Sequence, residues 1–147
     1  MISNINYKGR ISCVSHLEFR TSPPIQCVLR HKDYKIVVFP SMKCRIMGLK
    51  KPLQEKHIDM GVYQIEIESI QSVTWTFDLN TGPINLENVC KRLKCVFEPE
   101  LFPALRIVEY DPMCVNVFAS GKCVVTGSKA IDNIDELIRN VRSSVAS

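Results

Sequence analysis

The sequence predicts an α+β protein, in which one antiparallel sheet is built from two related halves and the last helix lies on the sheet. Three observations lead to this prediction. Residues 10–51 consist of short strand-like runs without helical periodicity, residues 62–147 contain similar runs with two helix-like segments among them, and one phrase of sequence occurs twice. We expect the halves, 1–61 and 62–147, to form one domain, because 147 residues lie within the usual size of a single domain.

The first half is rich in strand patterns. The runs ISCVSHLEF, IQCVLRH, YKIVVF and KCRIMGL are short and apolar, and SPP and PSM interrupt them. Proline and serine are typical of turns between strands, so each run is predicted to be a separate strand. The polar segment KKPLQEKHIDMG that follows is interpreted as a connector between the halves.

The second half is predicted to begin with a strand. In the run YQIEIESIQSVTWTF, Val73, Trp75 and Phe77 alternate with Thr74 and Thr76. Alternate residues of a strand face opposite sides of a sheet, so this pattern is typical of a strand with one buried face.

Two helices and a three-stranded meander are predicted after this strand. Pro83 should open a helix to about Lys94, because proline favours the first helical position. The runs LRIVEY, CVNVFAS and KCVVTG follow, and the DP and SG turn signals between them indicate antiparallel strands. The last helix is predicted from an apolar stripe at helical spacing, formed by Ile131, Ile134, Ile138, Val141 and Val145.

An internal repeat relates the halves. VVFPSMKCRIMGLK and NVFASGKCVVTGSK match without a gap at a period of about 79 residues. The corresponding pairs are Phe39 and Phe118, Ser41 and Ser120, Lys43 and Lys122, Gly48 and Gly127, and Lys50 and Lys129. The first half lacks helices, so we expect a pseudo-two-fold sheet with two unequal halves.

Composition argues against catalytic, metal-binding and membrane functions. The seven cysteines include no CxxC pair, and the three histidines are scattered, so we expect no metal, no cofactor and no disulfide framework. Catalytic motifs such as GxSxG or a P-loop are absent, which argues against an enzyme. No apolar run reaches the roughly 18 residues that a membrane helix needs. We therefore expect an intracellular protein in a reducing compartment, with no membrane partner.

Charge is distributed unevenly along the chain. Residues 1–60 carry 11 Lys and Arg against 4 Asp and Glu, whereas residues 61–147 carry 8 against 11. A basic half favours a polyanionic partner, although such an excess is also typical of an ordinary solvated face.

The string FEPELFPAL, residues 97–105, followed by VFASGKCVVTGSK, residues 117–129, closely resembles the second repeat of TATA-box-binding proteins. The resemblance covers residues 62–147 and, more weakly, residues 10–51. It implies a saddle-shaped, curved antiparallel sheet with helices on its convex face, and this sheet straddles double-stranded promoter DNA from the minor-groove side. In such a complex apolar wedges enter base steps, and the bent duplex contacts more of the protein. The helix-poor first half favours a large DNA virus as the source.

The resemblance also assigns residues to DNA contact. The wedges it implies are Phe102 and Phe118 in the second half, and Phe39 and Ile25 in the first. Strand alternation extends the concave face to Val37, Arg45, Met47, Asn116, Val124 and Thr126, leaving Val117, Cys123 and Val125 for the helices. Lys43, Lys50, Lys122 and Lys129 are expected to reach phosphates.

The sequence departs from the family in four ways. The DNA-facing asparagine of the first strand is missing from residues 9–19 and 65–79, where Ser12 and Gln71 or Ser72 occupy the neighbourhood. Second, Asn116 and Arg45 place polar groups on the strand face that is apolar in the family. Third, the positions of the family's two arginines in the second repeat lie here at about Val108 and Met113. Without helices, the convex side of the first-half sheet is expected to be uncovered, and a second copy or a partner chain would bind there.

The loop motif EPELF is intact. In the family this loop docks transcription factor IIB, so the resemblance makes Glu98, Glu100 and Leu101 candidates for contact with a IIB-like protein or an RNA polymerase subunit. We expect a transcription initiation factor that binds and bends promoter DNA in the nucleus or a viral factory. The alternative is a protein-interaction module of the same fold that no longer binds DNA specifically.

Overall fold

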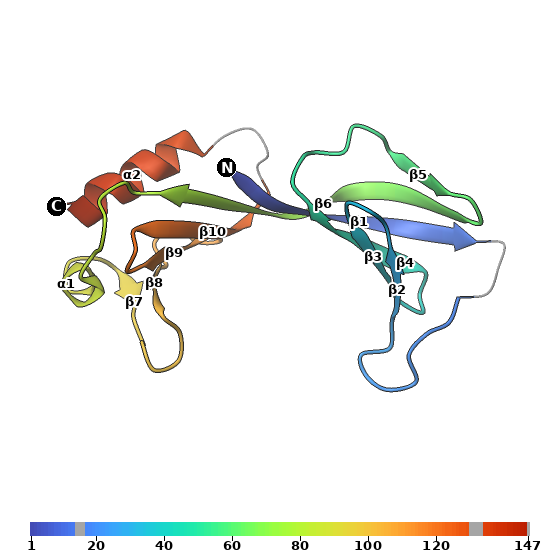
Figure 1. Ribbon diagram of the computed structural model, residues 1–147, viewed down its shortest axis with the longest axis horizontal. Helices are drawn as coiled ribbons and strands as arrows, with labels where there is room; N and C mark the ends of the chain where they lie inside the picture. Colours follow the sequence, from blue (N-terminus) through green and yellow to red (C-terminus); the bar gives the residue numbers. More distant parts are fainter. Residues whose placement is uncertain (14–16, 130–133, 147) are drawn as a thin grey trace. The chain divides into compact units, whose positions relative to one another are not determined.

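The computed structural model describes residues 1–13, 17–129 and 134–146 (Figure 1). The described residues form an α+β fold with many strands and few helices. In chain order the strands are β1 (Ile2–Cys13), β2 (Cys27–Arg30), β3 (Lys35–Val38), β4 (Lys43–Leu49), β5 (His57–Met60), β6 (Tyr63–Asp78), β7 (Cys95–Val96), β8 (Ala104–Ile107), β9 (Cys114–Phe118) and β10 (Lys122–Ser128). The helices are α1 (Leu86–Cys90), between β6 and β7, and α2 (Asp135–Ala146).

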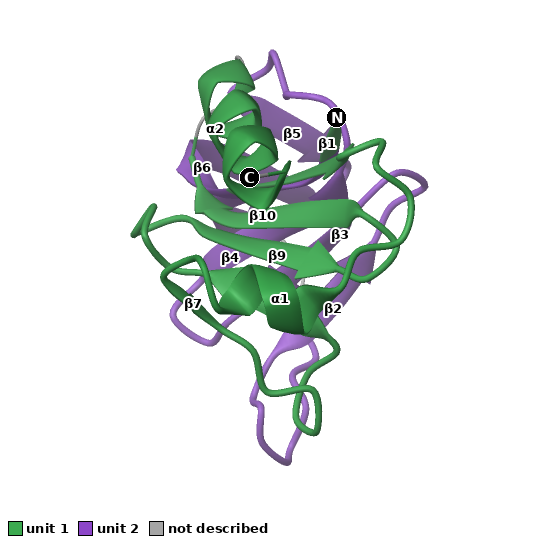
Figure 2. Cartoon of the chain, turned by 90° about the vertical axis from the view of Figure 1, so that its left-hand side faces the viewer, with its two compact units in different colours: residues 1–2, 73–147 green, residues 3–72 purple. Residues whose placement is uncertain are grey.

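The chain divides into two compact units (Figure 2). Residues 3–72 form the N-terminal unit, and residues 1–2 with 73–147 form the C-terminal unit. The strand β6 contributes residues 63–72 to the first of these and residues 73–78 to the second. Both described helices belong to the C-terminal unit, as the uneven distribution of helical patterns predicts.

In the N-terminal unit the strand order is β2-β3-β4-β1-β6, and β5 pairs with residues 63–66 of β6. Alternation gives this sheet one buried face. Its side chains, all less than a tenth exposed, include Ile5, Tyr7, Ile11, Cys44, Ile46 and Ile65.

The chain itself covers the buried face of the N-terminal unit. The Leu53 amide donates to the Tyr7 hydroxyl at 2.9 Å, and the Ile67 amide donates to the Lys56 carbonyl at 2.7 Å. These bonds place the segment after β4 alongside the sheet. The expectation that this face lies open is therefore wrong, whereas a second copy or partner chain bound to the first-half sheet stays a prediction.

Two further predictions for the first half are wrong. The first strand runs from Ile2 to Cys13, not from Ile11 to Phe19, because the alternation of buried Ile5, Tyr7 and Gly9 continues upstream. The supposed connector contains β5, in which Ile58 pairs with Ile65. A turn at Gly61, with φ +76°, lets β5 fold back on β6 as a hairpin.

In the C-terminal unit the order is β6-β10-β9-β8-β7, the antiparallel meander predicted from the turn signals with β7 added at its edge. The helix α1 is shorter than expected. It begins after Asn85, whose side chain accepts from the Asn88 amide at 3.2 Å, and it ends at Cys90. Residues 91–94 must instead lead the chain into β7.

The predicted apolar stripe of the last helix is confirmed at Ile134, Val141 and Val145, which are buried, while Ile138 is half-buried. Leu137, which was not predicted, is buried as well, and the Arg92 guanidinium donates to the Val145 carbonyl at 3.0 Å. The predicted start at Ile131 lies outside the described residues. Figure 1 shows α2 on one side of the C-terminal sheet, and the Arg142 guanidinium donates to the Asp78 carbonyl at the end of β6 at 2.9 Å.

The two units share one strand register, which confirms the internal repeat. Tyr7 pairs with Ile46 as Trp75 pairs with Val125, and both ladders then shift by one residue. Through these pairs, residues of β4 match those 79 positions later in β10, and residues of β1 match those 68 positions later in β6. Each position of one sheet therefore has a defined counterpart in the other.

Candidate nucleic-acid interface

One face of the C-terminal sheet is buried and the other is open. Val117, Cys123 and Val125 are fully buried, as alternation from Phe118 predicts. The open face carries a row of cross-strand neighbours, in which Val124 pairs with Thr76 and Asn116, and Asn116 pairs with Arg106. Arg106 is an exposed cation on this face that the sequence reasoning missed, although alternation from Asn116 through the turn could have indicated it.

Two phenylalanines meet at the end of this open face. The Phe102 and Phe118 rings lie edge to face, with centroids 6.1 Å apart and planes at 68°. Phe102 is 42% exposed, which is unusual for a large apolar ring. The loop that presents it is closed by the Leu101 and Phe102 amides, which donate to the Glu98 carbonyl at 2.9 and 3.0 Å. Phe102 and Phe118 therefore form a preformed aromatic pair.

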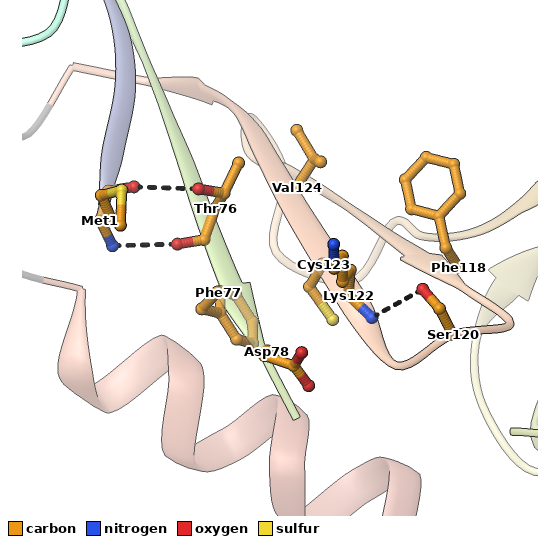
Figure 3. A pocket seen from close by; sticks show the side chains of 9 residues that line it. All are labelled: Met1, Thr76, Phe77, Asp78, Phe118, Ser120, Lys122, Cys123 and Val124. Carbon is orange, nitrogen blue, oxygen red and sulfur yellow. Dashed lines mark hydrogen bonds between the residues drawn. The ribbon is translucent and has the colours of Figure 1, made fainter. Parts of the chain in front are cut away.

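A hollow of about 630 Å³ lies beside Phe118 (Figure 3). Its wall is largely apolar, and the Lys122 amide donates to the Ser120 hydroxyl at 3.4 Å on its turn side. Met1 pairs with Thr76 at its other side, because the Met1 amine donates to the Thr76 carbonyl at 2.9 Å. The remaining lining residues are Phe77, Asp78, Cys123 and Val124.

The matching groove of the N-terminal unit, about 530 Å³, is basic. Its cations are Lys8, Arg10, Lys43 and Arg45, all exposed. Arg10 Nε lies 3.0 Å from Glu68 Oε1, and among the described residues this is the only ion pair. The Arg45 guanidinium lies over the Phe39 ring, 5.5 Å from its centroid. Sequence reasoning missed Lys8 and Arg10, because it began the first strand too late.

The other predicted site residues lie at several places. Val37 faces the same side as its partner Arg45 but is only 7% exposed. Ile25, 40% exposed, stands in a loop closed by the Arg20 amide and the Gln26 carbonyl at 3.0 Å. Thr126 is half-buried on β10 and Met47 on β4, while Lys43, Lys50, Lys122 and Lys129 are exposed at or just beyond strand ends. Glu98, Glu100 and Leu101 are exposed in the loop before β8, Leu101 by 80%.

The expected lack of asparagine on the first strand is wrong for the N-terminal unit. β1 carries Asn4 and Asn6, whose counterparts on β6 are Ser72 and Thr74. The Asn6 amide nitrogen donates to the Ser72 hydroxyl at 3.4 Å, whereas the Asn4 amide oxygen accepts from the Gly48 amide at 3.0 Å. A similar pattern in residues 2–5 and 70–73, ISNI and IQSV, could have revealed this correspondence.

A polar cluster therefore occupies the β1–β6 part of the N-terminal unit. Asn6 Oδ1 and Gln71 Oε1 are buried and have no hydrogen-bond partner among the described residues. A buried acceptor without a partner costs about 1–3 kcal/mol. Such groups are rare in native proteins, so each of the two calls for an explanation.

The described residues contain no group of three or more His, Cys, Asp or Glu side chains that could hold a metal ion. Burial raises the pKa of the Cys123 thiol to about 12 and of Cys44 to about 11, so these thiols stay protonated and lie within the core. No described helix is long and apolar enough to span a membrane.

Comparison with known proteins shows the family of the chain. The sequence profile of the family described as "Transcription factor TFIID (or TATA-binding protein, TBP)" matches residues 68–147, more than half of the chain. The chain belongs to this family. Its members include transcription factors, and the family resemblance noted from the EPELF and VFASGK motifs is thereby confirmed.

Archaeal relatives extend the similarity over most of the chain. A TATA-box-binding protein from Methanococcus maripaludis strain C7 is 30% identical over 145 residues, covering 88% of this chain and 78% of that protein. One from Pyrococcus abyssi is 30% identical over 132 residues, covering 81% and 69%. The solved structure of Methanococcus jannaschii TBP has a TM-score of 0.71 at 22% identity, covering 99% of this chain and 97% of that one, which shows the shared fold.

Proposed function

We propose that this TATA-binding-protein family member binds double-stranded promoter DNA through the minor groove and bends it. The observation that supports this most directly is the pair of exposed Phe102 and half-buried Phe118 at the end of an open strand face. An apolar ring held in water favours insertion between base pairs, because stacking on the bases removes its surface from water. The open face beside the pair supplies the contact area that stabilises a bent duplex.

Basic side chains around both open faces would hold the phosphates. Lys122 and Lys129 flank β10 as Lys43 and Lys50 flank β4, and all four are exposed. Contacts of this kind add affinity that falls with salt but carry no sequence information. On the open strand faces, the candidates for contact with base edges are Val124 and Thr126 in the C-terminal unit. In the N-terminal unit they are Val37 and Arg45.

The exposed loop before β8 is the proposed contact for a IIB-like protein or a polymerase subunit. Leu101 is 80% exposed, and the acids Glu98 and Glu100 stand on either side of Pro99. An exposed leucine beside two carboxylates is suited to a partner with an apolar pocket and a basic rim. A nuclear or viral-factory location and a viral source stay predictions.

One set of observations favours the alternative, a protein-interaction module of the same fold without specific DNA binding. Arg45 and Asn116 place polar groups on the strand faces that would contact the bases. Val108, 37% exposed, lies near a position where the family has an arginine. These side chains weaken a dry interface with bases, because each polar group needs a partner there.

Binding to an A·T-rich duplex, measured by fluorescence anisotropy from 50 to 200 mM salt, would separate the two functions. A promoter-binding factor should lose affinity steeply as salt rises, and energy transfer between dyes at the duplex ends should report bending. Combining Phe102→Ala with Phe118→Ala should abolish bending. The matched control is Leu101→Ala in the same loop, which should bend DNA normally and weaken only the IIB-like partner. Absent or salt-independent binding of the unsubstituted protein would contradict the DNA-binding function.

A further inference from the structure

The two Phe side chains at equivalent positions have different partners. Phe118 meets a second aromatic ring, Phe102, at 6.1 Å. Its counterpart Phe39 instead has the guanidinium of Arg45 over its face, 5.5 Å from the ring centroid. The loop that corresponds to that of Phe102 carries Ile25, and no aromatic contact to Phe39 occurs among the described residues.

The strands beside Phe39 are also more basic than those beside Phe118. Arg45 on β4 stands where β10 has Val124, Lys8 on β1 stands where β6 has Thr76, and Arg10 where β6 has Asp78. Glu68 pairs with Arg10 alone, while Lys8, Lys43 and Arg45 have no carboxylate within ion-pair distance among the described residues. The C-terminal face has its exposed arginine, Arg106, on β8 near the sheet edge instead.

Because of these differences, the two units would contact DNA in different ways. Parting two base pairs costs a few kcal/mol per step, which an apolar ring in dry contact offsets. A guanidinium that lies over the ring would have to lose its water as the ring enters, and this desolvation opposes insertion. In contrast, a guanidinium or ammonium group is attracted into a narrow minor groove, where the negative potential is strongest.

We propose that the N-terminal unit holds the minor groove electrostatically through Arg45, Lys8 and Lys43 without inserting Phe39, so that the C-terminal unit alone kinks the duplex. This inference rests on the proposed DNA-binding function. The N-terminal half-site is then selected for a narrow, A-tract-like minor groove, and the C-terminal half-site for a flexible pyrimidine–purine step.

Base unstacking can be followed with 2-aminopurine placed at one position at a time along an A·T-rich duplex. A single unstacked step is expected with the full chain. Phe118→Ala should remove this signal, because alanine is too short to enter a base step, whereas the matched change Phe39→Ala should leave it intact. Two separate unstacked steps, one of them lost in Phe39→Ala, would overturn the proposal.

The salt dependence of DNA affinity tests the electrostatic contact proposed for the N-terminal unit. Arg45→Val gives the N-terminal face the residue that β10 has, and Arg45 is exposed, so the fold should persist, which circular dichroism can verify. The slope of log affinity against log salt should become shallower by about 0.9, the value for one phosphate-neutralising cation. Arg139→Gln, which removes an exposed cation from α2, should leave the slope unchanged.

The outcomes separate this inference from the function on which it rests. An unchanged slope in Arg45→Val, with DNA still bound and bent by the parent chain, would overturn the inference and leave promoter binding in place. Failure of the parent chain to bind the duplex even at 50 mM salt would overturn both.

Discussion

At the scale of single residues, the buried thiol of Cys123 makes stability depend on pH. It lies on β10 with no exposed surface. Burial raises the pKa of its thiol to about 12, the nearby Asp78 carboxylate acts in the same direction, and Arg142 opposes them. In the unfolded chain the thiol returns to its ordinary pKa near 9. The folded state therefore binds this proton more tightly than the unfolded state.

The free energy of unfolding should decrease as pH rises above about 9, because the unfolded chain loses this proton first. The contribution is fully present below pH 9 and is lost as pH rises towards the folded pKa of about 12. Urea unfolding at pH 7.5 and pH 10.5 measures the decrease. Cys123→Val, which keeps an apolar side chain of similar size and cannot ionise, should show a smaller decrease. An equal decrease in the variant would show that other groups cause it.

At the scale of elements, the same irregularity shapes β4 and β10. Each ladder shifts register near its end, and a glycine with positive φ lies at the shift, Gly48 at +97° and Gly127 at +80°. Only glycine adopts this backbone conformation without strain. The surroundings differ, however, because a Cβ at Gly127 would lie 2.5 Å from the Pro112 carbonyl oxygen, whereas at Gly48 the nearest atom is 3.8 Å away.

Gly127→Ala should therefore destabilise the protein more than Gly48→Ala. The left-handed conformation alone costs an alanine about 1–2 kcal/mol, and at Gly127 the backbone at Pro112 must also move. Equilibrium unfolding in urea compares the two variants directly. Gly82→Ala provides the control for conformation alone, since its φ is +72° and no atom lies within 4 Å of the added Cβ. Equal losses of unfolding free energy for the changes at Gly48 and Gly127 would show that the backbone at Pro112 moves at little energetic cost.

Elements were predictable where local pattern and tertiary packing agree. Alternation around Phe118 predicts which residues of β9 and β10 are buried, and the apolar stripe predicts α2. The start of β1 was missed because Asn4, Asn6 and Lys8 make residues 2–10 polar on one side, and β5 because only Ile58 is buried there. In the interface, cross-strand register decides that Arg45 meets Phe39 and that Asn6 meets Ser72, and neither contact follows from local sequence.

At the scale of the whole molecule, the N-terminal unit carries 11 Lys and Arg against 6 Asp and Glu, and the C-terminal unit 8 against 9. The basic groove and the aromatic pair thus belong to different units, which share the continuous strand β6. If one unit unfolds, its part of β6 loses its strand structure up to the boundary at residues 72 and 73, where the other unit begins. This shared strand argues for cooperative unfolding of the two units.

The indole of Trp75, the chain's only tryptophan and 8% exposed, provides a probe of the C-terminal unit. Ile46, fully buried in the N-terminal unit, provides a remote perturbation. Ile46→Val should cost about 0.5–1.5 kcal/mol, and the urea midpoint of Trp75 fluorescence should fall together with that of far-ultraviolet circular dichroism, because unfolding of one unit frays β6 in the other. Val28→Ala, at a partly exposed site on the outer strand β2, should shift both midpoints little. A fluorescence midpoint that stays in place while the dichroism transition splits would show that the units unfold separately.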